Sequence, residues 1–285
     1  MTYTYITPAG ATYPLETFSR RRTRAIISIE GTGMPEMDLV TSRGPVQHGV
    51  SLEDWYLKER TIQIVMRHQY SCKQEYWAGR TALLQALLPS TTLATLRARL
   101  PNGDRRDIKV IVAQGPVFEP SSGWDEWGFT TVVRFLAPDP TFYDPNATSQ
   151  SWAPAAALGT FPMTFPVAFV GFTGSNVIVY GGSWPTYPTI TITGPVQSPI
   201  ITNVTTGQAI WFDYLVAVGE TVVIDLVEKT AVSSVAGNLL GSVFGDFATF
   251  QLALGSNTFT VYGSGVSAAT IITMSWYNRY VGLGA

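Results

Sequence analysis

The residue pair in this 285-residue chain that comes closest to a catalytic motif is Asp125 and Glu126, which lie between Trp124 and Trp127. Two carboxyl groups beside aromatic rings could hydrolyse a sugar that is bound on those rings. Neighbouring residues of a strand point to opposite faces, however, so these two groups cannot act on one bond as acid and base. We therefore expect the polar tip of a hairpin here, and no catalytic residue.

A second reactive pair is Cys72 and His68, four residues apart. A catalytic thiol needs a base and a third group that orients the base, and the sequence around Cys72 shows no such set. The glycine-rich segment 31–33 lacks the Lys-Ser/Thr of a phosphate-binding loop, and Met34-Pro35 follows it rather than a helix. One cysteine and two histidines leave few ligands for zinc. The sequence predicts neither an enzyme nor a bound cofactor or metal.

Arg20, Arg21, Arg22 and Arg24 form the densest group of positive charges. Guanidinium groups could bind phosphate or the carboxylates of a neighbouring subunit. They could equally keep a solvated strand edge from unwanted pairing. The formal net charge is −2, so no overall positive field attracts nucleic acid. A subunit interface and a solvated edge both remain open.

The composition favours strands and turns over long helices. Hydrophobic residues make up 46% and charged residues 13%, with 26 Gly, 18 Pro and 12% aromatics. The N-terminal residues show no charged segment followed by an apolar one, so no secretory signal is predicted and assembly in a cytoplasm is expected.

Charge divides the chain into two halves. Residues 1–144 hold 31 of the 38 charged residues, and none lies between Pro145 and Phe212. We predict a first domain over 1–145, a linker rich in Ala, Pro, Ser and Thr over 146–166, and a second domain over 167–285. Prolines and glycines interrupt the apolar stretch 153–172, so no membrane span is expected there.

The elements of the first half predict an α+β layer. Ile62, Ile64 and Met66 alternate with more polar residues, which is typical of a half-buried strand over 61–70. Further strands are expected over 107–113 and 129–136. A helix is expected over 73–88, with a capping box at Ser71 and Gln74 and an apolar face of Tyr76, Leu83, Leu84 and Leu87.

The second half predicts an antiparallel β-sandwich, because short β-rich runs alternate with Gly, Pro, Asn and Ser and no helical pattern intervenes. The expected strands are 167–172, 177–180, 189–193, 209–212, 221–227, 247–252, 258–262 and 270–276. The fold class is therefore mainly β, with one amphipathic helix in the first half.

The order of motifs resembles the distal tail protein (Dit) family of long-tailed, non-contractile bacteriophages. The hub domain of that family is similar to three pieces of the first half: Arg43-Gly44-Pro45-x-x-His48-Gly49, Arg60-Thr61-Ile62-x-Ile64, and a closing strand that runs into Ala137-Pro138-Asp139-Pro140-Thr141-Phe142.

The second half resembles the galectin-like C-terminal domain of the family. The matching pieces are Pro188-Thr189-Ile190-x-Ile192-x-Gly194, Val222-Val223-Ile224-Asp225, Leu252-x-Leu254-Gly255-x-Asn257 and Ile272-x-Met274-x-Trp276-Tyr277. Leu254 stands where the family usually has proline.

This resemblance implies a structural virion protein at the tail tip, without an active site. The chain would form a ring, hexameric in the family, through which DNA passes without specific binding. Its implied partners are the tail tube, the tail-associated hub protein, and receptor-binding proteins or side fibres. A tail-tube protein with an appended sandwich, and a carbohydrate-binding module, are the alternatives. The expected interface residues are Arg20, Arg21, Arg22, Arg24, Arg43 and Arg60, and the motif residues expected to be structural are Gly44, His48, Gly49, Asp139, Pro140, Phe142, Gly255 and Asn257.

Overall fold

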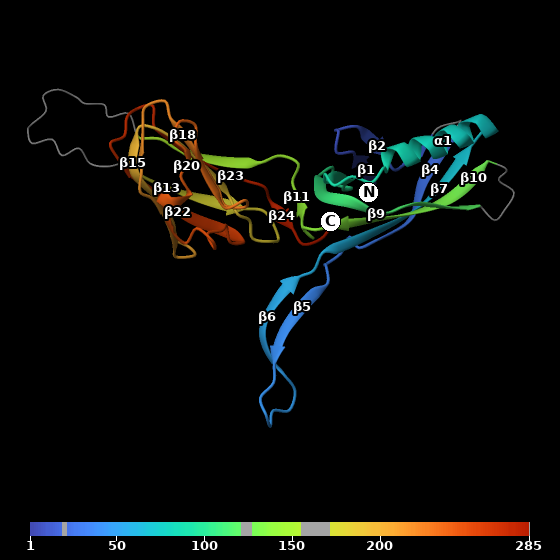
Figure 1. The fold of residues 1–285 in the computed structure, drawn as a ribbon, viewed down its shortest axis with the longest axis horizontal. Coiled ribbons are helices and arrows are strands. Elements are labelled where there is room, and N and C mark those ends of the chain that lie inside the picture. Colours follow the sequence, from blue (N-terminus) through green and yellow to red (C-terminus); the bar gives the residue numbers. More distant parts are fainter. Residues whose placement is uncertain (19–21, 121–126, 155–171, 285) are drawn as a thin grey trace, which may run out of the picture. The chain divides into compact units, whose positions relative to one another are not determined.

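The computed structural model describes residues 1–18, 22–120, 127–154 and 172–284. The chain divides into two units, which are described separately: residues 1–145 with 280–285, and residues 146–279. The fold is mainly β, as expected from the sequence, with a single α-helix among the described residues (Figure 1). No helix in these ranges is long and apolar enough to cross a membrane.

Unit 1 is built on a ten-stranded sheet in which β9 has two sets of partners. The sheet order is β2-β1-β8-β9-β10-β7-β4-β3, with β11 beside β9 and β24 beside β11. The first part of β9 pairs with β8, and its last part pairs with β10. The elements are β1 (Thr2–Ile6), β2 (Thr12–Pro14), β3 (Thr17–Phe18), β4 (Arg22–Glu30), β5 (Met37–Ser42), β6 (Ser51–Leu57), β7 (Arg60–Tyr70), α1 (Lys73–Ala86), β8 (Ala94–Arg99), β9 (Arg105–Pro120), β10 (Gly128–Ala137), β11 (Phe142–Tyr143) and β24 (Arg279–Tyr280).

The core of unit 1 follows the alternation predicted for β7. Ile62, Ile64 and Met66 are fully buried and pack with residues of β1, β8, β9 and β10. Helix α1 contacts β7 and β9 and contributes Leu83 and Leu87 to this core. Burying the inward residues of the sheet and one stripe of the helix is the main stabilising contribution to such a layer.

The ends and the apolar face of α1 differ from the expectation. Its N-cap is Cys72, and no side chain caps it. The predicted capping box at Ser71 and Gln74 is wrong, because the Ser71 hydroxyl donates instead to Glu75 at 2.8 Å. Leu84 is 46% exposed, so the buried stripe is narrower than predicted.

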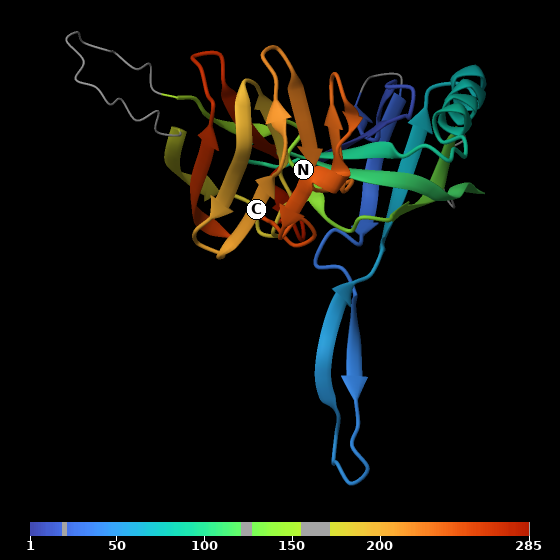
Figure 2. The same ribbon diagram turned by 60° about the vertical axis from the view of Figure 1, so that its left-hand side comes forward.

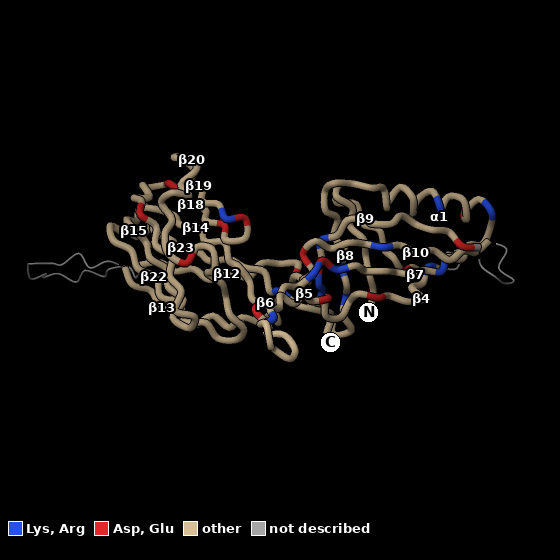
Figure 3. Tube along the Cα trace, turned by 60° about the horizontal axis from the view of Figure 1, so that its bottom comes forward, with Lys and Arg blue, Asp and Glu red and all other residues tan. Residues whose placement is uncertain are grey.

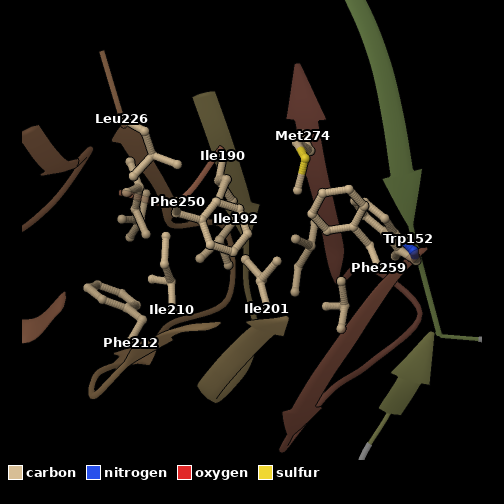
Figure 4. Close-up of a cluster of buried hydrophobic side chains, with 14 of the residues drawn as sticks. Trp152, Ile190, Ile192, Ile201, Ile210, Phe212, Leu226, Phe250, Phe259 and Met274 are labelled. Carbon is tan, nitrogen blue, oxygen red and sulfur yellow. The ribbon is translucent and has the colours of Figure 1, made fainter. Parts of the chain in front are cut away.

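Unit 2 is a two-sheet sandwich. One six-stranded sheet has the order β12-β23-β14-β18-β19-β20, and the other has the order β13-β22-β15-β16-β21 with β17 beside β15. Inward residues of both sheets form one core (Figure 4). The elements are β12 (Thr148–Trp152), β13 (Phe172–Tyr180), β14 (Thr189–Thr193), β15 (Val196–Asn203), β16 (Gln208–Phe212), β17 (Leu215–Val216), β18 (Thr221–Asp225), β19 (Thr230–Ser233), β20 (Gly237–Asn238), the 3-10 helix η1 (Leu240–Ser242), β21 (Val243–Gly245), β22 (Gly255–Ser264) and β23 (Ile271–Trp276).

Two segments near the core of unit 2 differ from the expectation. Residues 148–152, predicted to be linker, form β12, which pairs with β23 and places Trp152 in the core. The rest of the predicted linker, from 155 on, and nearly all of the predicted strand 167–172 lie outside the described residues. The predicted strand 247–252 is a turn, because the Asp246 carbonyl accepts the backbone N–H groups of Thr249 and Phe250. Phe250 is nonetheless buried, so an apolar run here marks burial without a strand.

Candidate assembly surface

The β5–β6 hairpin leaves the large sheet of unit 1 and forms a two-stranded sheet of its own (Figures 1 and 2). An isolated two-stranded hairpin is marginally stable in water, and three or more strands or a packing partner are usually needed. This hairpin therefore stands out as a part of the chain that another surface would stabilise.

The two faces of the hairpin differ in chemistry, because residues directly opposite one another share a face. Met37 opposes Leu57, Leu39 opposes Trp55, and Thr41 opposes Leu52. We call Met37, Leu39, Leu52, Trp55 and Leu57 the hairpin apolar face. Between 43% and 60% of the surface of Met37, Leu39, Leu52 and Trp55 is exposed. A continuous exposed apolar strip of this kind is typical of a protein–protein contact.

The opposite face of the hairpin is polar and makes its own contacts. Asp38 lies 3.7 Å from the Lys58 ammonium. Asp54 accepts hydrogen bonds from the Tyr56 hydroxyl and from the Trp55 backbone N–H, both at 2.8 Å. The hydrogen bond from Tyr56 and that from the backbone lower the pKa of Asp54, while the carboxylate raises the pKa of Tyr56. The polar face is therefore suited to water, and the apolar face to another chain.

The tip of the hairpin carries the motif residues Arg43, Gly44, His48 and Gly49. Gln47, between them, organises the loop: its Oε1 accepts the Gly44 backbone N–H at 2.9 Å, and its Nε2 donates to Ser51 at 2.8 Å. Arg43 donates to the Gln47 carbonyl at 3.3 Å. His48 and Gly49 are exposed. The motif thus shapes a loop, and Arg43 is exposed there, so its place at a subunit interface stays a prediction.

Arg60, also predicted to lie at an interface, is instead inside unit 1 with 3% exposure. Its guanidinium group lies 4.9 Å from the centre of the Phe142 ring and donates to four backbone carbonyls. Burial lowers the pKa of Arg60 to about 10. The interface prediction for Arg60 is therefore wrong. No local sequence pattern reveals this burial, because the carbonyls that Arg60 binds come from three distant segments. These are Gly31 at 2.7 Å, Gly33 at 2.5 Å, Pro140 at 2.8 Å and Val281 at 2.6 Å.

The arginine cluster is divided by the fold. Arg20 and Arg21 lie outside the described residues, and Arg22 begins β4. Arg24 is 7% exposed, stacks 4.3 Å from the Tyr13 ring centre and donates to the Pro14 carbonyl. Arg24 is therefore a core residue and not the interface residue that we predicted, because alternation along β4 turns it inward.

The residues Asp139, Pro140 and Phe142 close unit 1 with a turn. Asp139 accepts the Thr141 backbone N–H at 3.0 Å and the Thr141 hydroxyl at 2.6 Å. Its other oxygen accepts the Tyr143 hydroxyl. Phe142 is buried beneath Arg60, whose Nε binds the Pro140 carbonyl. This motif therefore fixes the chain where it leaves the unit.

Asn257 has the same kind of role in unit 2. It is fully buried and accepts the backbone N–H of Ala253 at 2.9 Å. Its amide donates to the carbonyls of Ala253 at 2.7 Å and Gly255 at 3.1 Å. Asn203 of β15 donates to it at 3.2 Å. The motif Leu252-x-Leu254-Gly255-x-Asn257 thus closes a loop and ties it to the neighbouring strand.

Comparison with known proteins finds a match to this C-terminal part. Residues 181–280 match the family described as siphovirus-type tail component, C-terminal domain. No curated protein matches the chain. The crystal structure of Dit from phage SPP1, described as a paradigm of the hub adsorption apparatus of phages that infect Gram-positive bacteria, has a TM-score of 0.64 at 13% identity, over 98% of this chain and 98% of that chain.

Two structures of the phage P2 baseplate in its activated conformation are also similar. The form with calcium has a TM-score of 0.48 at 10% identity, covering 97% of each chain. The form with strontium has a TM-score of 0.46 at 11% identity, covering 96% of this chain and 97% of that chain. The resemblance drawn from the sequence is confirmed as a match of residues 181–280 to the model of this tail-component domain, and as a similarity of fold to SPP1 Dit over nearly the whole chain.

Among the residues that the structure describes, no group of three His, Cys, Asp or Glu side chains could hold a metal ion. Asp125 and Glu126, the two carboxyl groups considered for sugar hydrolysis, lie outside the described residues. Cys72 is exposed, and His68 is fully buried. What the sequence missed is the amphipathic hairpin. The alternation of Met37, Leu39 and Thr41 would have signalled it, but the matching face of β6 depends on a bulge at Val40 and Thr41.

Proposed function

We propose that this chain is a structural hub protein at the tip of a long, non-contractile phage tail. It assembles with copies of itself into a closed ring, hexameric as the family resemblance implies, around the channel through which DNA leaves. The match of residues 181–280 to a siphovirus tail component and the Dit-like fold of the chain support this role. The role is non-enzymatic, and the tail tube and the tail-associated hub protein are the neighbours above and below.

The observation that carries the proposal is the hairpin apolar face. When copies of a protein bind head to tail through two different surfaces, they form a closed ring if the rotation from each copy to the next adds up to a full turn. We infer that the hairpin supplies one of these surfaces, because it forms a sheet of its own outside the ten-stranded sheet and its apolar residues are exposed. In the ring, the apolar face of each hairpin would pack on unit 1 of the next copy. Burial of apolar surface there contributes roughly 25 cal/mol per Å².

Charge is consistent with a conduit for DNA. The chain carries 18 basic and 20 acidic residues. Arg97 and Asp107 pair at 2.7 Å, and Arg106 pairs with Asp144 at 2.6 Å. Cations neutralised in this way attract phosphate weakly. Passage of DNA without specific binding is therefore part of the proposal.

The two units would have different roles in the assembly. Residues 1–145 with 280–285 would form the ring, and the sandwich over 146–279 would project outward to receptor-binding proteins or side fibres. The sandwich is poor in charge, with 2 basic and 5 acidic residues (Figure 3). An uncharged polar surface suits contact with another protein.

Sedimentation velocity of the full chain at micromolar concentration tests the proposal. Wild type is expected to form one closed species of about six copies. Leu39→Glu, on the hairpin apolar face, is expected to give monomers, because a carboxylate cannot be buried there without a partner. Val40→Glu is the matched control, because Val40 is 43% exposed on the polar face of the same hairpin.

Circular dichroism confirms folding of each variant, and Leu52→Glu provides a second disruption of the same face. A wild type that stays monomeric at every concentration would refute the proposal, as would rings that survive both apolar-face variants. Long stacked tubes would favour the tail-tube alternative instead.

A further inference from the structure

The outer face of one sheet of the sandwich carries a row of apolar side chains that crosses four strands. Tyr262 of β22 opposes Ile200 of β15, Ile200 opposes Trp211 of β16, and Trp211 opposes Phe244 of β21. Each is 37% to 45% exposed. The outer face of such a sheet usually carries polar residues, so this row needs an explanation that the fold alone does not supply. We call these four residues the outer row.

One end of the outer row borders a hollow of about 280 Å³, lined by Ser198, Ile200, Trp211, Phe212, Asp213 and Phe244. This volume is close to the lower end of the range for small-molecule sites, about 300 to 1,000 Å³. The rings of Trp211 and Phe244 are nearly parallel, at 14°, with centres 6.4 Å apart. The hollow thus combines flat aromatic surfaces with a carboxylate and a hydroxyl group.

The polar groups of this hollow are available to a ligand. Among the residues that the structure describes, none forms a hydrogen bond or an ion pair with the side chain of Asp213 or Ser198. Ser198 has a φ of 45°, a conformation rare for residues other than glycine, at the point where β15 is irregular. Strained residues of this kind are concentrated at binding sites, where they fix a group in place.

The indole of Trp211 packs against the backbone of β21. Gly245 has a φ of 90°, and a Cβ atom there would lie 2.7 Å from Cζ3 of Trp211 and 2.3 Å from the Ala209 carbonyl oxygen. The indole therefore lies directly against the Gly245 backbone. Contacts with Gly245 and Phe244 restrict the ring, and such restriction lowers the side-chain entropy that ligand binding would cost.

We propose that the outer row and its hollow bind a neutral saccharide chain. The apolar faces of sugar rings pack on exposed aromatic rings, while sugar hydroxyls donate to the Asp213 carboxylate and the Ser198 oxygen. Strands lie about 4.8 Å apart, so the four residues span roughly 14 Å, which suits several linked sugar rings. This site is independent of the hairpin and goes beyond the hub role.

The negative charge of Asp213 favours a neutral saccharide over an apolar protein surface or an acidic sugar. An apolar protein surface over the hollow would bury Asp213 without a partner, which costs several kcal/mol, whereas hydroxyl groups satisfy it. An acidic sugar would be repelled by the same carboxylate. A neutral, hydroxyl-rich ligand is the class that both the rings and the carboxylate accept.

Saturation-transfer NMR of the full chain tests the site, with neutral tetrasaccharides of glucose, galactose, N-acetylglucosamine and rhamnose, and with tetragalacturonic acid. Transfer from the protein to sugar-ring protons is expected for at least one neutral probe and not for the acidic one. Trp211→Ala and Phe244→Ala should each weaken binding about tenfold or more. Asp213→Asn should weaken the neutral probe about tenfold while improving binding of the acidic one.

Val223→Ala is the matched control, because Val223 is an exposed residue, 38%, on the outer face of the other sheet. Thermal melting verifies that each variant is folded. Absence of transfer from all four neutral probes at millimolar concentration would overturn the proposal, and so would binding that survives both aromatic substitutions. Burial of Trp211 in the assembled ring, seen as a blue shift of fluorescence that Trp211→Ala abolishes, without any response to sugar, would assign the row to a protein partner. None of these outcomes depends on the hairpin variants that test ring formation.

Discussion

His68 makes a specific pH dependence of stability measurable in unit 1. It lies on β7, fully buried, with its ring stacked 4.5 Å from that of Phe129. Neither ring nitrogen has a hydrogen-bond partner among the described residues. Burial, and then the positive charge of Arg24, lower the pKa of His68 from 6.5 to about 3. The imidazole is therefore neutral in the folded protein at neutral pH.

The sign of the effect follows from linkage. The unfolded chain binds a proton at His68 below about pH 6.5, whereas the folded chain does so only near pH 3. The stability that depends on neutral His68 is therefore fully present above about pH 6.5 and is lost as the pH falls towards 3. Each pH unit in this window is worth about 1.4 kcal/mol, so His68 alone should cost about 2 kcal/mol between pH 7 and pH 5.

The perturbation is His68→Met, which keeps a similar volume and cannot take up a proton. Its loss of stability between pH 7 and pH 5 should be about 2 kcal/mol smaller than that of wild type. At pH 7 it should be as stable as wild type or more so, because two unsatisfied nitrogens, at about 1 to 3 kcal/mol each, are removed while the ring contacts with Phe129 and Tyr70 are lost.

The assay is guanidinium unfolding at pH 7, 6 and 5, with hydrogen exchange of peptides from β7 and β10 as the probe of unit 1. All samples have the same protein concentration, because assembly adds to apparent stability. His48→Met serves as the control, because His48 is exposed at the hairpin tip, and should follow wild type. Equal pH slopes for His68→Met and wild type would refute the reasoning.

Three further substitutions test the internal contacts. Arg60→Met leaves four backbone carbonyls without this donor and should cost about 3 to 5 kcal/mol in unit 1, because each unsatisfied buried acceptor costs about 1 to 3 kcal/mol and some will find water. Guanidinium unfolding measures this cost, with the exposed Arg99→Met as the control, and equal midpoints for the two variants would contradict it. Asn257→Ala removes hydrogen bonds that close the loop before β22 and should cost about 2 to 4 kcal/mol in unit 2, seen in its thermal melting; a shift of less than one degree would count against this. Gly31→Ala places a Cβ atom 2.0 Å from the Thr61 carbonyl oxygen at a φ of 83° and should destabilise unit 1 by more than about 2 kcal/mol. Gly33→Ala is the control, because no atom lies within 4 Å of the added Cβ. Similar losses of stability for both variants would contradict this prediction.

The strands were predictable where alternation was strict and burial one-sided. β14 has the predicted bounds of 189–193, and β7 begins one residue before the prediction, because Ile and Met at every second position can be buried on one face. Burial without regular hydrogen bonding was not predictable from the same signal. Phe247 to Leu252 are apolar enough for a strand, but the carbonyl of Asp246 turns the chain there.

The sequence by itself determined the mainly β fold, the charge-poor second half, and the absence of a readable catalytic motif, because composition and period are local properties. It also carried the order of motifs that led to the distal tail proteins. Only the tertiary structure decided which arginines are internal, because the four carbonyls that Arg60 binds lie as far away as Val281. The same holds for the outer row, since Tyr262, Ile200, Trp211 and Phe244 become neighbours through strand register, and register between distant strands is set by the packed core rather than by any one segment.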